Sequence, residues 1–222
     1  GVESMSRVKM GSDGGAIWEA DTQWKVGSVP QGISADLLAT LYGISRQDAD
    51  AFALRSQQLA AKAQDAGAFA RSILPVKDEN GLPLLEQDEF IRRDTTVEKL
   101  GQLKASFEMM GTKFGLDSLT RRRYPQVEQV HHIHTAGNSS GIVDGAAAVL
   151  VGSATAGEQL GLKPRAKIRS IALCGEDPVL MLTGPIPATK RALQKAGMGI
   201  QDIDLFEINE AFAVQVLAFL DH

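Results

Sequence analysis

Two polar stretches of this 222-residue chain have the residue types that a ligand site needs. The first, residues 137–141, reads Gly-Asn-Ser-Ser-Gly and lets the backbone turn tightly and approach a ligand closely. The second begins at Asn209, directly after an expected strand over residues 203–208. In parallel α/β sheets ligands bind at the carboxyl ends of strands, so both stretches are candidate site segments.

Asn209 carries the more specific chemistry of the two. A neutral amide both donates and accepts hydrogen bonds, so it can hold a water molecule that serves as an oxyanion donor. The plainer interpretation makes Asn209 a helix N-cap with Glu210 in the first turn. Residues 137–141 likewise have a plainer interpretation, a Gly/Ser loop that leads into a core strand.

Composition places the chain among globular proteins and excludes several functions. Hydrophobic residues make up 44% and charged residues 23% of the sequence. A net charge of -4, without a basic arm, argues against nucleic-acid binding, and no apolar run is long enough for a membrane span. The single cysteine, Cys174, excludes an internal disulfide and fits a reducing compartment, so we expect a cytoplasmic protein, or one of an organellar matrix.

Hydrophobic spacing predicts a helical first half. A helix is expected from Gly32 to Gly43, and a long amphipathic one over 47–64 behind a Ser45–Asp48 capping box. A hairpin over 73–85 and a short helix over 95–103 follow, and Trp18 and Trp24 are expected to be packing anchors. Residues 13–130 therefore read as an inserted, α-rich lobe.

The second half alternates expected strands with expected helices. Strands are predicted at 146–151, 166–173 and 203–208, and helices at 153–162, 187–196 and 210–220. This order implies a mostly parallel sheet with helical cover, an α/β fold.

Five stretches, taken together, identify a family. They are residues 1–6 (Gly-Val-Glu-Ser-Met-Ser), 50–57, 135–147 around the polar loop, 184–188 (Gly-Pro-Ile-Pro-Ala) and 209–213 (Asn-Glu-Ala-Phe-Ala). In this order and spacing the chain resembles the thiolase family, which includes acetyl-CoA acetyltransferases and 3-ketoacyl-CoA thiolases.

The resemblance implies a thiolase fold, layered α-β-α-β-α, here incomplete and with an inserted α-rich loop domain. Residues 1–12 would end the N-terminal half, 13–130 would form the CoA-covering loop domain, 131–163 would complete that half, and 164–222 would start the C-terminal half. Family members are usually homodimers or homotetramers, and we expect the same of the full-length protein.

The resemblance also assigns roles to single residues. Asn209 matches the residue that fixes the oxyanion-hole water, and Phe212 in the same stretch is expected to line the substrate site. Ser140 matches a contact to the pantetheine of CoA, and Arg92 a contact to its adenine or phosphate end. Gln31 stands where short-chain members have a His-Met pair in the acyl tunnel. That departure, with the insertion over 108–130, favours a degradative member, as in fatty-acid β-oxidation.

The family's chemistry needs a nucleophilic Cys before the stretch at residues 1–6, and a Gly-His-Pro motif and second Cys after 209–213. Neither lies within residues 1–222. We therefore expect an internal part of a longer acyltransferase, inactive alone, which uses CoA as substrate and needs no further cofactor. The alternative is a naturally short, thiolase-like CoA-binding or interaction module without catalysis.

Other residues have plainer interpretations. Cys174 matches neither family cysteine and is expected to be a buried packing residue. The run Arg121–Arg123 is expected to be a solvated face. His131, His132 and His134 lack a supporting cluster of carboxylates or cysteines, so no metal site is predicted.

Overall fold

The computed structural model describes residues 1–12, 14–15 and 19–222. The expectation for Trp18 lies outside the described residues. Trp24 is 58% exposed, with the Arg122 guanidinium 4.1 Å above its ring. The prediction that Trp24 is a packing anchor is therefore wrong. Its indole ring lies at the surface, where it makes a cation–π contact with Arg122 instead of packing in the core.

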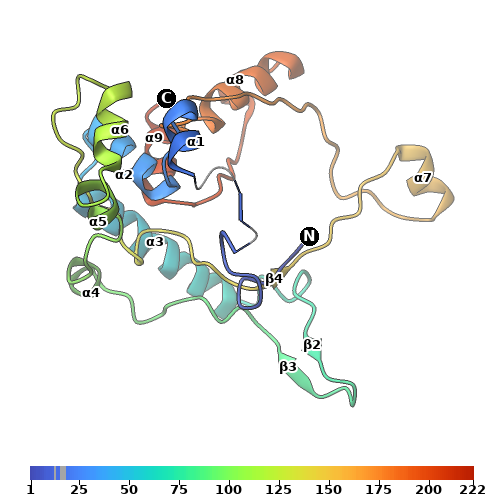
Figure 1. Cartoon of the computed structure of the whole chain (residues 1–222). Helices are drawn as coiled ribbons and strands as arrows, with labels where there is room; N and C mark the ends of the chain where they lie inside the picture. Colours follow the sequence, from blue (N-terminus) through green and yellow to red (C-terminus); the bar gives the residue numbers. More distant parts are fainter. Residues whose placement is uncertain (13, 16–18) are drawn as a thin grey trace.

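Helix α2 (Gln31–Tyr42), on the left in Figure 1, has more buried residues than any other described helix. Its residues 32–39 are all buried, and it packs against α6 (Leu116–Arg123) and α9 (Ala213–Leu220). Gly43 ends the helix in the left-handed region at φ 65°. The predicted helix and its glycine stop are thus confirmed.

Helix α3 (Arg46–Asp65) packs against α4 (Val97–Gly101) and α9. The Ser45 hydroxyl accepts from the Asp48 amide, and the Asp48 carboxylate accepts from the Ser45 amide. This reciprocal pair is the predicted capping box, which fixes where the longest helix begins.

Among the other helices of the described residues, α7 (Ala154–Gln159) and α8 (Pro185–Ala196) lie close to the predicted ranges 153–162 and 187–196. Helices α1 (Ala20–Val26) and α5 (Glu108–Thr112) and a 3-10 turn (Ile200–Asp202) were not predicted. Among the described residues, no helix combines the length and the apolar character that crossing a bilayer requires.

Two small antiparallel pairs are the only sheet structure within the described residues. Strands β2 (Val76–Lys77) and β3 (Pro83–Leu85) form the predicted hairpin, which projects from the body in Figure 1. Strands β1 (Val2–Glu3) and β4 (Gly145–Ala146) pair the start of the chain with the segment after the polar loop.

The three predicted core strands do not form in the described residues. Of 146–151 only Ala146 is paired in a strand, while Val149 and Leu150 are 87% and 82% exposed. Residues 166–173 and 203–208 are irregular as well, with Leu173 85% and Leu205 88% exposed. These runs have strand composition, but no described strand lies beside them to complete a parallel ladder. The division into 1–12, 13–130, 131–163 and 164–222 stays a prediction.

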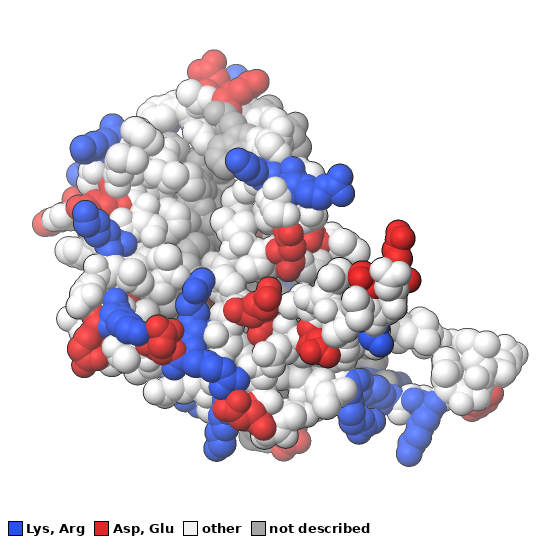
Figure 2. All heavy atoms as spheres, turned by 90° about the horizontal axis from the view of Figure 1, so that it is seen from below, with Lys and Arg blue, Asp and Glu red and all other residues white. Residues whose placement is uncertain are grey.

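One face of the molecule carries charges of both signs (Figure 2). In the face shown in Figure 2, Lys and Arg side chains are interspersed with Asp and Glu side chains. This face as a whole is therefore not dominated by charges of one sign.

Candidate functional site

The structure brings the two candidate stretches side by side. The Ser140 amide donates to the Ala211 carbonyl at 2.9 Å, and the Ala213 amide donates to the Asn138 carbonyl at 3.0 Å. Between these bonds, Ser139 and Phe212 form an antiparallel bridge. The polar loop and the segment before α9 are therefore fixed against each other, although more than sixty residues separate them in the sequence.

Asn209 lies at the exposed edge of this junction, two residues before Ala211. Helix α9 begins only at Ala213, and its N-cap is Phe212. The plainer interpretation of Asn209 as an N-cap is therefore wrong, while its water-holding role stays a prediction. Its neighbour Glu210 accepts from the Ser56 hydroxyl of α3 at 2.6 Å, which ties this segment to the helix.

Ser140 and Arg92 approach each other through an aromatic ring. Ser140 is exposed beside Gly141, where an added Cβ would overlap the Phe90 ring. The Arg92 guanidinium carbon lies 5.1 Å from the centroid of that same ring, and the Arg92 amide donates to Gln57 of α3. Both predicted CoA contacts thus lie along one side of the molecule, near α3.

A pocket of about 340 Å³ opens beside Arg92, between α3 and the segment before α4. Its cationic lining groups are Lys62, Arg92 and Arg93. Arg93 is already paired with Asp65 at 2.9 Å and with Gln64 at 2.5 Å. Guanidinium groups in such a setting suit phosphate oxygens, since they present several donors in one plane.

Phe212 and Gln31 have different surroundings. Phe212 is 6% exposed, with its ring edge-on to Phe107 at 6.0 Å and to His134 at 5.3 Å. Gln31 is exposed in the first turn of α2, and it is the neighbouring Gly32 that faces the Phe107 ring. The sequence did not single out Phe107, because one aromatic in a segment without period gives no sign of what it packs against.

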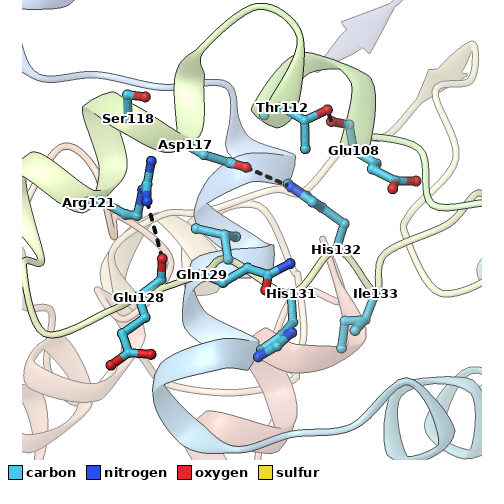
Figure 3. A pocket seen from close by; sticks show the side chains of 12 residues that line it. Glu108, Thr112, Asp117, Ser118, Arg121, Glu128, Gln129, His131, His132 and Ile133 are labelled. Carbon is cyan, nitrogen blue, oxygen red and sulfur yellow. Dashed lines mark hydrogen bonds and ion pairs between the residues drawn. The ribbon is translucent and has the colours of Figure 1, made fainter.

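Two of the three neighbouring histidines, His132 and His134, are held by carboxylates. Asp36, fully buried in α2, accepts from Nδ1 of His132 and of His134, each at 2.7 Å, and from the Ile133 and His134 amides. Nε2 of His132 lies 3.1 Å from Asp117 of α6 (Figure 3). The described residues contain no cluster of three or more groups arranged to bind a metal.

These contacts change two pKa values. The hydrogen bonds to Asp36 and Asp117 raise the pKa of His132 to about 9, although burial opposes the change. Burial alone would raise the pKa of Asp36, but the hydrogen bonds from His132 and His134 outweigh it and lower that pKa. His132 is therefore an imidazolium between two carboxylates at neutral pH.

A second pocket, of about 500 Å³, lies over this cluster, between α5, α6 and residues 128–133 (Figure 3). At its wall Gly111 leaves room for Asp117 and His132, since an added Cβ would overlap both side chains. None of the predicted site residues lines this pocket.

The remaining candidates are structural. Arg121 to Arg123 lie on the surface, as predicted, and contact the Glu128 carbonyl, the Trp24 ring and Asp177 in turn. Cys174 is half-buried rather than buried, and its thiol donates to the Gly184 carbonyl at 3.1 Å. Its expected place in the core is wrong, because the strand before it does not form.

Comparison with known proteins decides the family. The sequence model of the thiolase N-terminal domain matches residues 1–118, and that of the thiolase C-terminal domain matches residues 162–222. The chain belongs to the thiolase family.

Relatives of this thiolase-family chain are similar over almost all of it. The 3-ketoacyl-CoA thiolase of Marinobacter nauticus is 42% identical over 224 residues, which cover 99% of this chain and 52% of the relative. The acetyl-CoA acetyltransferase of Chromobacterium violaceum is 46% identical over 189 residues, which cover 84% of this chain and 43% of the relative. The chain thus spans about half the length of the curated relatives that it matches.

Solved structures support the same fold. The Bacillus anthracis acetyl-CoA acetyltransferase superposes with a TM-score of 0.72 at 36% identity, covering 90% of this chain and 48% of that one. Human mitochondrial 3-ketoacyl-CoA thiolase superposes with a TM-score of 0.72 at 35% identity, and the match covers 90% of this chain and 47% of the human chain. The predicted thiolase fold class is therefore confirmed.

Proposed function

We propose that this chain supplies part of an acyl-CoA acyltransferase site, which cleaves 3-ketoacyl-CoA by thiolysis or runs the reverse condensation. The single observation that carries the proposal is the junction of the polar loop with the segment before α9. It joins the two stretches for which thiolase-like chemistry gives a role, in a chain that belongs to that family.

In this proposal each residue has a distinct task. Arg92 binds the phosphate or adenine end of CoA at the pocket beside α3, and Ser140 hydrogen-bonds the pantetheine arm. Asn209 holds the water that stabilises the oxyanion as the thioester carbonyl is attacked. Phe212 lines the substrate site near Phe107, with which it packs edge-on. Gln31 sits at the acyl end, at the start of α2.

We further propose that residues 1–222 bind CoA without acyl transfer. The only cysteine of the chain is Cys174, whose thiol donates to the backbone carbonyl of Gly184, and no hydrogen bond within the described residues joins it to a base. A thiolate nucleophile needs a cation or base beside it to lower its pKa. A thiolysis assay with acetoacetyl-CoA tests this point, and turnover by this chain would contradict it.

Calorimetric titration with CoA tests the binding site. Arg92→Ala should weaken CoA binding by about tenfold or more, since a charge-assisted hydrogen bond contributes about 1.5–3 kcal/mol. Arg93→Ala is the matched control, because that neighbouring guanidinium lines the same pocket but is already paired with Asp65 and Gln64. Equal losses of CoA affinity in both variants would indicate nonspecific charge attraction and would contradict the assignment of Arg92 as a CoA contact.

A further inference from the structure

One face of α3 carries side chains that hold the three segments of the proposed site. Asp50 bonds Asn138 of the polar loop, Ser56 bonds Glu210 beside Asn209, and Gln57 accepts from the Arg92 amide. Positions 50, 53 and 57 lie along one helical stripe, and Ser56 flanks it. The helix therefore sets where all three segments lie relative to one another.

The buried contact among these is that of Asp50 with Asn138. Asp50 is 4% exposed and Asn138 is 3% exposed. The Asn138 amide nitrogen donates to Asp50 Oδ1 at 2.9 Å and to the Ile133 carbonyl at 3.2 Å, while its oxygen accepts from the Thr135 amide. The backbone carbonyl of Asn138 also accepts from Ala213. Asn138 is thus the residue through which the loop is tied both to α3 and to the segment before α9.

The second carboxylate oxygen of Asp50 extends the network. It accepts from Nε of Arg46 at 2.7 Å, one helical turn away. An Nη2 group of Arg46 donates to the Leu100 carbonyl at 2.5 Å and to the Leu103 carbonyl at 3.1 Å. Both oxygens of Asp50 are therefore used, and the network reaches from the polar loop to the end of α4.

We propose that Asp50 is a positioning residue: its carboxylate, held by Arg46, fixes the Asn138 loop and so places Ser140 against the Asn209 segment. The inference rests on the proposed function for what those two residues do. Asp50 itself touches no substrate in this proposal. It acts through Asn138, whose orientation decides whether the Ser140 and Ala213 backbone bonds can form together.

A buried carboxylate at position 50 lowers the stability of the fold unless its hydrogen-bond partners offset the loss of hydration. Removing a buried charge from water is unfavourable and is offset only by well-made partners. An apolar side chain would pack beside Ala49 and Ala53 without that cost, but it could not accept from both Asn138 and Arg46. The charge therefore serves the orientation of its partners rather than packing.

Exchange of partners tests the network. Asp50→Asn removes the charge, and Asn138→Asp sets two carboxylates against each other. The double variant Asp50→Asn/Asn138→Asp restores a donor-acceptor pair in the opposite direction. Amide hydrogen exchange at Ser140 and Ala213 reports the junction directly, because both amides are bonded across it.

We expect both single variants to speed exchange at Ser140 and Ala213 by about tenfold or more, relative to the amides of α2. CoA affinity should fall by a similar factor. The double variant should recover part of both losses, because a carboxylate at position 138 can pair with position 50 but can no longer donate to the Ile133 carbonyl. Leu119→Ala is the control for general destabilisation, since Leu119 lies in another part of the core and should speed exchange in α2 and the loop alike.

Each outcome decides a separate point. The positioning role of Asp50 would be overturned if the single variants sped exchange in α2 as much as at Ser140 and Ala213. It would also be overturned if these two amides exchanged as fast in the double variant as in the single variants. Selective exchange with full CoA affinity in the single variants would also overturn it. If the unmodified chain binds no CoA, the proposed function fails, and the exchange rates still decide whether Asp50 fixes the loop.

Discussion

His132 links the stability of the fold to pH. Its side chain is 6% exposed and contacts Asp36 and Asp117, with Asp36 also holding His134. A histidine whose pKa is higher in the folded chain than in the unfolded chain binds its proton more tightly when folded. The folded state is therefore stabilised by protonation of this one side chain.

We predict that stability falls between pH 6.5 and pH 9. The pKa of His132 rises from 6.5 to about 9 on folding, so its contribution is complete below 6.5 and is lost as the pH rises through 9. Urea-unfolding midpoints across this range measure the loss, and His132→Gln should flatten the curve. A variant with the same slope as the unmodified chain would show that another group titrates. Asp36, with its lowered pKa, adds a separate loss of stability only below its ordinary value of 3.8.

Gly111 is required by the same cluster. It is buried in α5, and an added Cβ would overlap Asp117 and His132. We predict that Gly111→Ala costs about 1–3 kcal/mol of unfolding free energy, the usual cost of overpacking. Gly101→Ala is the matched control, since Gly101 also lies in a short helix but has no atom within 4 Å of its added Cβ. Equal unfolding free energies in the two variants would contradict the overlap.

At the scale of elements, the capping box of α3 gives a sharp test. Ser45→Ala removes the hydroxyl that accepts from Asp48 and should cost about 1 kcal/mol of unfolding free energy. Ser153→Ala removes the same kind of cap from α7, in which no residue is buried. The α7 cap should change helix fraying without moving the urea midpoint. A shift of that midpoint as large as in Ser45→Ala would show that α7 is coupled to the core.

The elements also show what can be predicted from sequence. Helices α2 and α3 were predicted because their hydrogen bonds, the Gly43 stop and the Ser45 cap are all local. The strands at 146–151, 166–173 and 203–208 were also predicted but do not form, because a strand exists only where a distant segment pairs with it. Composition records that a run is apolar and β-branched, but not whether its partner is at hand.

The candidate site divides in the same way. Ser140 lies in one of the five short stretches that carry the family resemblance, and the resemblance assigns a role to Arg92 as well. Asp50 lies within one of those stretches, yet its role could not be assigned, because Asn138 is eighty-eight residues away. Contacts between distant segments thus decide which polar residues position the others.

At the scale of the whole molecule, exposed apolar runs are the dominant feature. The segment that leads from β4 to α7 extends away from the helical body (Figure 1), and its residues Val149, Leu150 and Val151 are 67–87% exposed. Runs of high β-propensity with unpaired backbone groups are templates for pairing with other chains. The run of residues 149–151 therefore leaves unpaired apolar backbone open to another copy of the chain.

We predict that residues 1–222 self-associate in dilute solution through this run. Sedimentation velocity over a wide dilution series should show association in the unmodified chain and less of it in Leu150→Lys, because a charge on an open edge opposes pairing. Ile200→Lys is the control, since Ile200 is 60% exposed but stands between Gly199 and Gln201 rather than in an apolar run. Both substitutions replace an exposed apolar side chain by the same cation, so a difference between them isolates the effect of the run. A monomeric unmodified chain at every concentration would show that its exposed apolar surface is too small, or too mobile, to pair.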